Sequence, residues 1–404
     1  MDAVRRAQDW AIAVFVRYPW IGWAAWLIFC IASLLRTHPR RFGSTFQAYL
    51  TAAHNFWNAQ PIYDMSVLGE YLYWPVSLLV LGPLPALPPI AAAAIAMAMS
   101  AIVLSLASIV LMRALLPERP RAEVINLAGI LLMINIPAAW YNFKYVQAQI
   151  GMTAFMMLAA AAIARRHWLM ACFWLFFSII TKPLSLVMLL LCGATQPRMR
   201  IGLALALVAA LALPFGFADM HYVANEYRTW FVKLQQLASV APGEWPYQAD
   251  FATLLDTIGI DLPHMAQTGV RLVAALGILA LVWRVAQLQN RVVFAMALTL
   301  FAGCYITLFG PRNEFLSFLV LTPPLTALAL LLQTHDARDR RAWALIAAVL
   351  VIGFHGALEV DRALKPLRTF VILGWMIWLT WVPERWLELF RPGSSPLPLG
   401  EVGA

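Results

Sequence analysis

Residues 310–315 combine a cation, an amide and a carboxylate in a short turn between two long apolar runs. Their sequence is Gly-Pro-Arg-Asn-Glu-Phe. Charged side chains at the edge of a membrane segment are costly unless they face protein or water, so their presence favours a functional role. Arg312 can bind a phosphate, Asn313 can hydrogen-bond a substrate, and Glu314 can accept a proton as a general base. The alternative is a structural ion pair that caps two helices.

A second unusual cation, Lys182, is followed by a proline in the middle of the apolar stretch 168–194. Arginines flank this stretch on both sides, and we expect two short arms that meet at Lys182 and keep both arginine clusters in the cytoplasm. A lysine at the tip of such a hairpin has little room to reach the membrane surface, and it can bind a phosphate. Lys144 and Arg271 are further candidates for phosphate binding or simple interfacial anchors, and Gln147 is a candidate substrate ligand.

The polar stretch after the first apolar run holds a further group of candidates. Asp64 and Glu70 are alternatives to Glu314 as the base, and Tyr49, His54 and Tyr73 are candidates for substrate binding. Tyrosines also populate interfacial belts, so this signal is weak. The spacing of His54 matches no metal-binding motif, and the sequence indicates no cofactor, although a divalent metal is left open.

These residues must be positioned by membrane helices. Of 404 residues, 62% are hydrophobic and 12% are charged, and many apolar runs approach the roughly 20 residues that a spanning helix needs. The sequence therefore predicts an all-α polytopic membrane protein in contact with membrane lipids. The net charge of +9 comes from short basic clusters between apolar runs, which is the positive-inside pattern and implies no nucleic-acid partner.

The basic clusters order the chain into about twelve membrane segments with two long extracytoplasmic loops. We expect one membrane domain over 1–391, followed by a disordered tail over 392–404. Its parts are a first span at 19–35, an outer loop with juxtamembrane helices at 36–88, spans over 89–217, a second outer loop at 218–268 and spans over 269–383. In the first loop, residues 46–57 predict an amphipathic helix with Phe46, Tyr49, Ala53 and Phe56 on one face.

The order and spacing of several motifs resemble those of glycosyltransferase family 87, a family of polytopic GT-C enzymes. The resemblance covers roughly residues 42–332. It rests on the first outer loop, on Gln147, and on three further motifs, Lys182-Pro183-Leu184, Pro311-Arg312-Asn313-Glu314 and Thr322-Pro323-Pro324. In this family the catalytic base is an aspartate. It lies four residues before the tyrosine that matches Tyr49, and here that position is Thr45. A valine, Val146, replaces the glycine that precedes the family's glutamine.

The resemblance implies a membrane enzyme that moves a mannose-like or pentose sugar from a polyprenyl-phosphate donor to a glycolipid or glycan acceptor. The active site is expected on the outer face of the bacterial cytoplasmic membrane. A transporter or flippase for a lipid-linked saccharide would need a similar cavity, and an inactive scaffold of the same fold is a third interpretation. Transport favours polar groups spread through the membrane depth, whereas here they gather at one face, which favours transfer.

Overall fold

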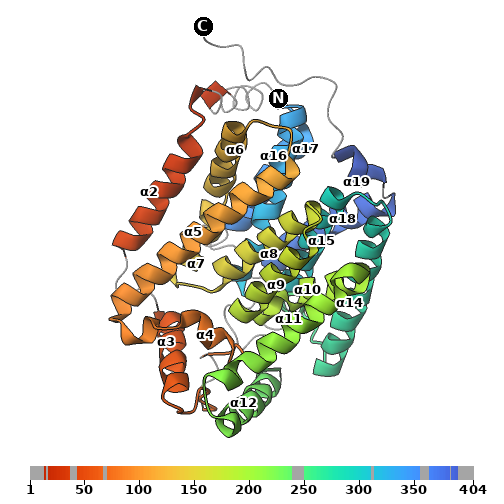
Figure 1. Ribbon diagram of the computed structural model, residues 1–404. Helices are drawn as coiled ribbons and strands as arrows, with labels where there is room; N and C mark the ends of the chain where they lie inside the picture. The colour runs from red at the N-terminus through yellow and green to blue at the C-terminus, as the bar shows by residue number, and fades with distance from the viewer. Residues whose placement is uncertain are drawn as a thin grey trace.

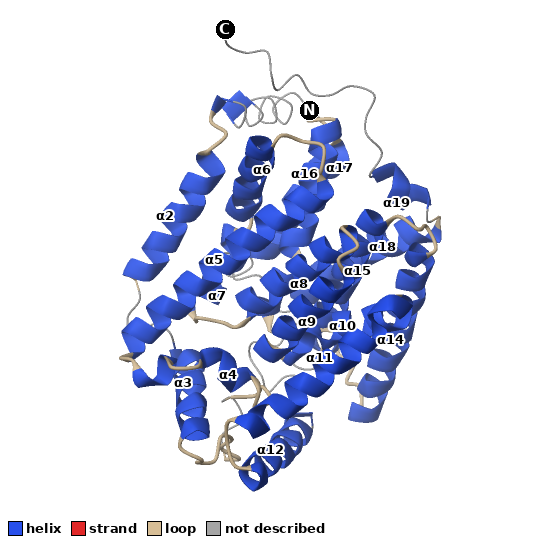
Figure 2. Ribbon diagram, in the orientation of Figure 1, coloured by secondary structure: helices blue, strands red, loops and turns tan. Residues whose placement is uncertain are grey.

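The computed structural model describes residues 13–14, 17–36, 43–66, 71–238, 250–310, 314–354, 364–382 and 384–389. Within these ranges every regular element is an α-helix or a short 3-10 helix (Figure 2), which confirms the predicted all-α class. The predicted tail at 392–404 lies outside the described residues.

Five segments of the described chain are long and apolar enough to cross a membrane. They are α5 (Pro89–Leu115), residues 197–216 around α11 (Arg200–Ala212), α14 (His264–Ala286), α15 (Arg291–Phe309), and residues 316–335, which combine η6 (Phe315–Val320) with α16 (Thr322–His335). Shorter apolar helices are α2 (Ile21–Leu35), α8 (Gln149–Ala164), α9 (Trp168–Thr181), α10 (Leu186–Thr195) and part of α18 (Leu364–Trp381). The count of about twelve segments stays a prediction.

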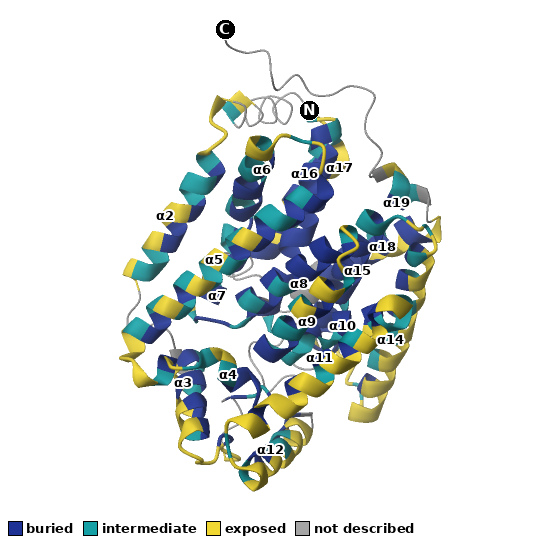
Figure 3. Cartoon of the chain, in the orientation of Figure 1, coloured by how far each residue is buried: buried dark blue, intermediate teal, exposed yellow. Residues whose placement is uncertain are grey.

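The outward surfaces of these helices are apolar. In α14, Leu272, Val273 and Leu276 are 61%, 71% and 58% exposed, and Figure 3 shows exposed residues along the whole length of this helix. Water-soluble proteins rarely expose large contiguous apolar patches. Lipid contact explains this surface, so the chain is an integral membrane protein.

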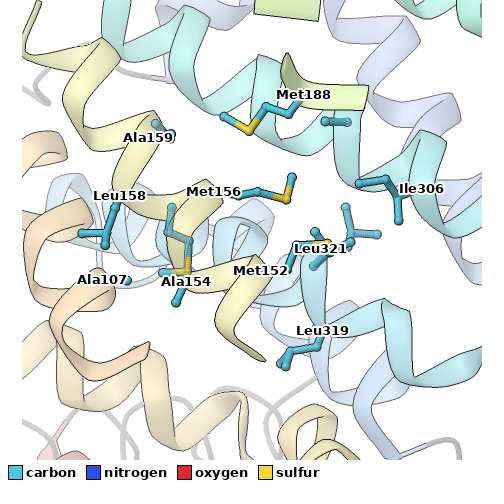
Figure 4. Packing of buried hydrophobic residues seen from close by; sticks show 14 of the residues in the cluster. Ala107, Met152, Ala154, Met156, Leu158, Ala159, Met188, Ile306, Leu319 and Leu321 are labelled. Atoms are coloured by element: carbon cyan, nitrogen blue, oxygen red, sulfur yellow. The ribbon is translucent and has the colours of Figure 1, made fainter. Parts of the chain in front are cut away.

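The core is centred on α8, which packs against α5, α9 and α15. Met152 and Met156 of α8 are fully buried, and Figure 4 shows them close to Met188 of α10, Ile306 of α15 and Leu321. The run of alanines at 159–162 is also buried. Small side chains allow close helix approach in membranes, which places α8 at the centre of the helices that carry the candidate residues.

One predicted crossing, residues 124–140, is not a straight helix. α6 (Arg121–Ile134) and α7 (Ile136–Lys144) meet at a bend of 64°. Pro137 lies in the first turn of α7, where it cannot continue the hydrogen-bond ladder of α6. Asn135 stabilises the bend, since its Nδ2 donates to Leu131 O at 2.8 Å and to Thr326 Oγ1 at 3.0 Å. The bend directs α7 toward η6.

The break at Lys182 is present as predicted, with α9 ending at Thr181 and η2 (Pro183–Ser185) leading into α10. The two arms pack on different neighbours, α9 on α8 and α11, and α10 on α15 and α14. Lys182 itself is extended, with φ −154° and ψ 123°.

The two long loops contain helices, and three of them, α3, α4 and α12, lie at one end of the molecule, the lower end in Figure 1. The first contains α3 (Gly43–Trp57), α4 (Ser77–Leu81) and η1 (Leu84–Ala86), and the second contains α12 (Met220–Ala238) and α13 (Phe251–Thr257). The predicted face of α3 is confirmed, because Phe46, Tyr49, Ala53 and Phe56 are all buried. The remaining elements are η3 (Pro197–Met199), η4 (Leu213–Gly216), α17 (Arg340–Gly353) and α19 (Glu384–Leu389).

The contact between α2 and α6 allows a stability test. A Cβ atom at Gly22 would overlap the backbone of Gly129, whereas one at Gly277 would meet no atom within 4 Å. Gly22→Ala should therefore lower the free energy of unfolding by about 1–3 kcal/mol. Gly277→Ala should leave it unchanged or raise it by up to about 1 kcal/mol through helix propensity. Thermal unfolding in detergent measures both, and equal midpoints would contradict the close approach of α2 and α6.

Candidate functional site

Three tyrosines from the first loop pack together near the break between α9 and η2. We call Tyr49, Tyr71 and Tyr73 the tyrosine cluster. The ring centroid of Tyr49 lies 6.0 Å from that of Tyr71 and 5.4 Å from that of Tyr73, and the rings of Tyr71 and Tyr73 are 5.7 Å apart. Tyr71 is 2% exposed and Tyr49 is 6% exposed. Tyr73 is half-buried, so it forms the accessible side of the cluster.

A chain of hydrogen bonds connects the cluster to the turn between α7 and α8. Tyr49 Oη donates to Gln147 Oε1 at 3.0 Å and lies 2.9 Å from Tyr73 Oη. A hydroxyl has one proton, so Tyr73 must donate to Tyr49. Gln147 therefore presents its carbonyl oxygen to Tyr49 and directs its amide nitrogen, with two N–H donors, elsewhere. Burial, Tyr73 and the negative charge of Glu314 raise the pKa of Tyr49, which keeps this hydroxyl protonated.

Lys182 lies over the open side of the tyrosine cluster. Its Nζ is 5.4 Å from the ring centroid of Tyr73, a distance at which a cation is attracted to an aromatic face. The surrounding backbone is held on both sides. Trp74 Nε1 donates to Ile179 O at 3.1 Å, and Ser185 Oγ donates to Lys182 O at 3.1 Å.

Glu314 approaches the cluster from the start of η6. Its charge contributes to the raised pKa of Tyr49, so its carboxylate lies within electrostatic range of that hydroxyl although the two residues are far apart in the chain. The bent helix α7 holds this segment, because Asn142 Nδ2 donates to Leu316 O at 3.1 Å. The structure thus brings together Glu314, Lys182, Gln147, Tyr49 and Tyr73 among the predicted residues.

The backbone beside Gln147 is strained. Val146 has φ +48°, a left-handed conformation that a β-branched residue rarely adopts. Glycine adopts it without steric cost. A glycine would therefore suit this position, and the valine adopts the turn at a conformational cost.

The second loop holds the first loop through one face of α12. Four side chains of this helix bond to the backbone of the first loop. Tyr222 donates to Gln60 O, Glu226 accepts from Ile62 N, Trp230 donates to Leu72 O, and Lys233 donates to Asp64 O. Glu226 is 3% exposed and Lys233 is 1% exposed. This α12 clamp fixes the backbone on both sides of residues 67–70.

The other predicted residues that the structure describes have different surroundings. Asp64 is exposed and accepts hydrogen bonds from Ser66. His54 is exposed and lies 3.3 Å from Asn58 Nδ2. Lys144 lies over the rings of two tyrosines of its own segment. Arg271 pairs with Asp250 at 3.7 Å and lies over Phe251. Glu70, Arg312 and Asn313 lie outside the described residues.

Sequence reasoning missed Tyr71, Asn142 and the α12 clamp. Tyr71 belongs to an aromatic run that an interfacial belt would also explain. The sequence does contain a pattern that could have indicated the clamp. Positions 222, 226, 230 and 233 recur at helical spacing in a loop that was expected to be polar. No spacing rule could indicate which backbone atoms they bind.

Comparison with known families identifies one that matches this chain. Residues 71–311, more than half of the chain, match the family profile described as glycosyltransferase family 87. The matched region contains Tyr73, Gln147, Lys182 and the α12 clamp. It begins after Tyr49 and ends before Glu314. No curated protein matched the chain.

The α12 clamp predicts a pH effect that two substitutions separate. Burial raises the pKa of Glu226, so the folded protein holds this proton to a higher pH than the unfolded chain does. The contribution to stability is therefore present below the unfolded pKa and is lost as pH rises through the folded pKa. Glu226→Gln keeps an acceptor for Ile62 N–H and should remove this pH slope.

Glu226→Leu removes the acceptor as well. It should cost about 1–3 kcal/mol, because it leaves a buried N–H unpaired. Thermal unfolding measured from mildly acidic to neutral pH compares the two variants with the wild type. Equal stability of the glutamine and leucine variants would contradict a role for this hydrogen bond.

Proposed function

The chain belongs to glycosyltransferase family 87, and we propose that this membrane glycosyltransferase uses a polyprenyl-phosphate sugar as donor and a glycolipid or glycan as acceptor. The sugar is mannose-like or a pentose. One observation carries the proposal, namely that Lys182 lies over Tyr73 of the tyrosine cluster while the charge of Glu314 acts on Tyr49 of the same cluster. A cation for a leaving phosphate and a carboxylate for an incoming hydroxyl are the two groups that such a transfer needs.

Lys182 is the proposed ligand of the donor phosphate. It is half-buried over Tyr73, where its charge is screened less than at an open surface. Gln147 supports the same anion, since its hydrogen bond with Tyr49 leaves the amide N–H groups as its outward donors. Arg312, two positions before Glu314 in the sequence, is proposed as a second phosphate ligand, and Asn313 as a substrate ligand.

Glu314 is the proposed general base. An acceptor hydroxyl attacks the anomeric carbon of the donor sugar, and the bond from that carbon to the phosphate oxygen breaks. The hydroxyl proton passes to the Glu314 carboxylate, and the polyprenyl phosphate leaves with its negative charge against Lys182. Thr45 cannot take this proton at neutral pH, because a hydroxyl is far too weak a base.

We propose that the site faces the outside of the bacterial cytoplasmic membrane. Arginines gather at the other ends of the helices, where Arg119 donates to Thr334 O and Arg165 donates to Val110 O. By the positive-inside rule that end faces the cytoplasm. A lipid phosphate then carries the sugar, because nucleotide sugars are not available outside the membrane.

Two substitutions test the roles of the charged pair. Lys182→Met should raise the KM for the donor or lower turnover, because a charge-assisted bond to phosphate is lost. Glu314→Gln keeps the shape of the side chain and should lower turnover by roughly 10² to 10⁴ while donor binding and thermal stability persist. Glu118→Gln is the matched control, since Glu118 is exposed outside the cluster. The measurement is release of polyprenyl phosphate by the purified protein in nanodiscs.

Three outcomes would contradict the assignment. If turnover is near normal in Glu314→Gln but is lost in Asp64→Asn or Glu70→Gln, the base belongs to the first loop. Unchanged donor affinity and turnover in Lys182→Met would reduce Lys182 to an interfacial anchor. Mass spectrometry of envelope glycolipids should show one sugar fewer in cells that lack the protein, whereas unaltered glycolipids would contradict transfer.

A further inference from the structure

A cavity of about 630 Å³ lies between α3 and the extended segment that follows it. Along α3 it is lined by Gln47, Thr51 and Asn55, which recur every fourth residue and so share one face. The opposite wall comprises Tyr63, Asp64 and Tyr71. Gln47, Thr51 and Asp64 are exposed, so the cavity opens to the surface. Its volume falls within the range of small-molecule sites.

The lining fits a neutral ligand rich in hydroxyl groups. Amide, hydroxyl and carboxylate groups can each donate to or accept from such a ligand. None of the described lining residues is a lysine or an arginine. Hydrogen bonds from Ser66 lower the pKa of Asp64, and the Lys233 ammonium that donates to Asp64 O offsets the charge of its carboxylate, so the wall offers a phosphate no net positive charge. The cavity therefore differs in chemistry from the surroundings of Lys182.

Tyr71 joins the cavity to the candidate site. This side chain lines the cavity, and its ring packs against both Tyr49 and Tyr73. Lys182 lies over the ring of Tyr73. The cavity is thus separated from the phosphate ligand by more than one aromatic ring. The donor sugar is bonded directly to its phosphate and so occupies the space nearer to Lys182.

The cavity wall is held rigidly. Asn55 Nδ2 donates to Pro61 O at 2.9 Å, which joins α3 to the opposite wall. The α12 clamp binds the backbone of Gln60, Ile62 and Asp64 from the outer side. A preformed wall lowers the entropy that ligand binding costs.

We infer that this cavity binds the glycan of the acceptor, beyond the hydroxyl that reacts. The inference rests on the proposed function and divides the substrates between two places. The donor phosphate binds at Lys182, and the neutral acceptor glycan binds between α3 and residues 61–65. The reacting hydroxyl extends from the cavity past Tyr71 toward the donor sugar.

Steady-state kinetics of the full-length protein in nanodiscs test this division. The donor is a polyprenyl-phosphate mannose with a labelled sugar, and the acceptor is the glycolipid extract of cells that lack the protein. The double variant Gln47→Ala, Thr51→Val removes polar groups from the exposed rim, and Thr51→Trp fills the space. Asn58→Ala is the matched control, because Asn58 is exposed immediately after the end of α3 and outside the cavity lining.

We expect both cavity variants to raise the acceptor KM by roughly tenfold or more, the double variant through two lost hydrogen bonds and Thr51→Trp by occupying the cavity. The donor KM should stay within twofold of the wild type. An unchanged acceptor KM in folded cavity variants, or a rise in the donor KM alone, would overturn the inference while leaving the proposed function intact. Absence of any transfer by the wild-type protein would overturn the proposed function and the acceptor site with it.

Discussion

Gln147, Lys182 and Glu314 all lie where a helix is interrupted, and an interrupted backbone inside a membrane protein is stable only when its polar groups find partners within the protein. The partners are specific. Trp74 binds Ile179 O at the end of α9, Ser185 binds Lys182 O, and Asn142 binds Leu316 O after Glu314. The bonds of Trp74 and Asn142 each join one interruption to a distant part of the chain, and the bond of Ser185 closes the turn at Lys182. The same hydrogen bonds that make the interruptions tolerable therefore fix the distances between the functional side chains.

The opposite ends of the molecule have opposite chemistry. One end carries arginines that bind backbone carbonyls near helix C-termini, such as those of Thr334 and Val110. The other end contains the tyrosine cluster, the α12 clamp and the cavity beside α3. This separation orients the protein in the bilayer, and Lys182 lies at the end that holds the tyrosine cluster.

Helices, the breaks between them and the buried face of an amphipathic helix could be predicted from the sequence, because they depend on local periodicity and on proline. The buried face of α3 and the break at Lys182 are examples. The 64° bend at Asn135 was missed, since residues 124–140 are apolar enough for a straight span. The bond between Tyr49 and Gln147 could not be derived, because it joins residues 98 positions apart through tertiary packing. From the sequence, Glu314 and Tyr49 were expected only to lie on the same face of the membrane.

The most direct test of phosphate binding at Lys182 is a density map of the protein in nanodiscs with bound polyprenyl phosphate. We expect phosphate density in hydrogen-bond contact with Lys182 Nζ, beside the ring of Tyr73 and on the same side as Glu314. Phosphate density at the arginine-rich end near Arg165, or over Lys144 with Lys182 still packed on Tyr73 alone, would contradict it.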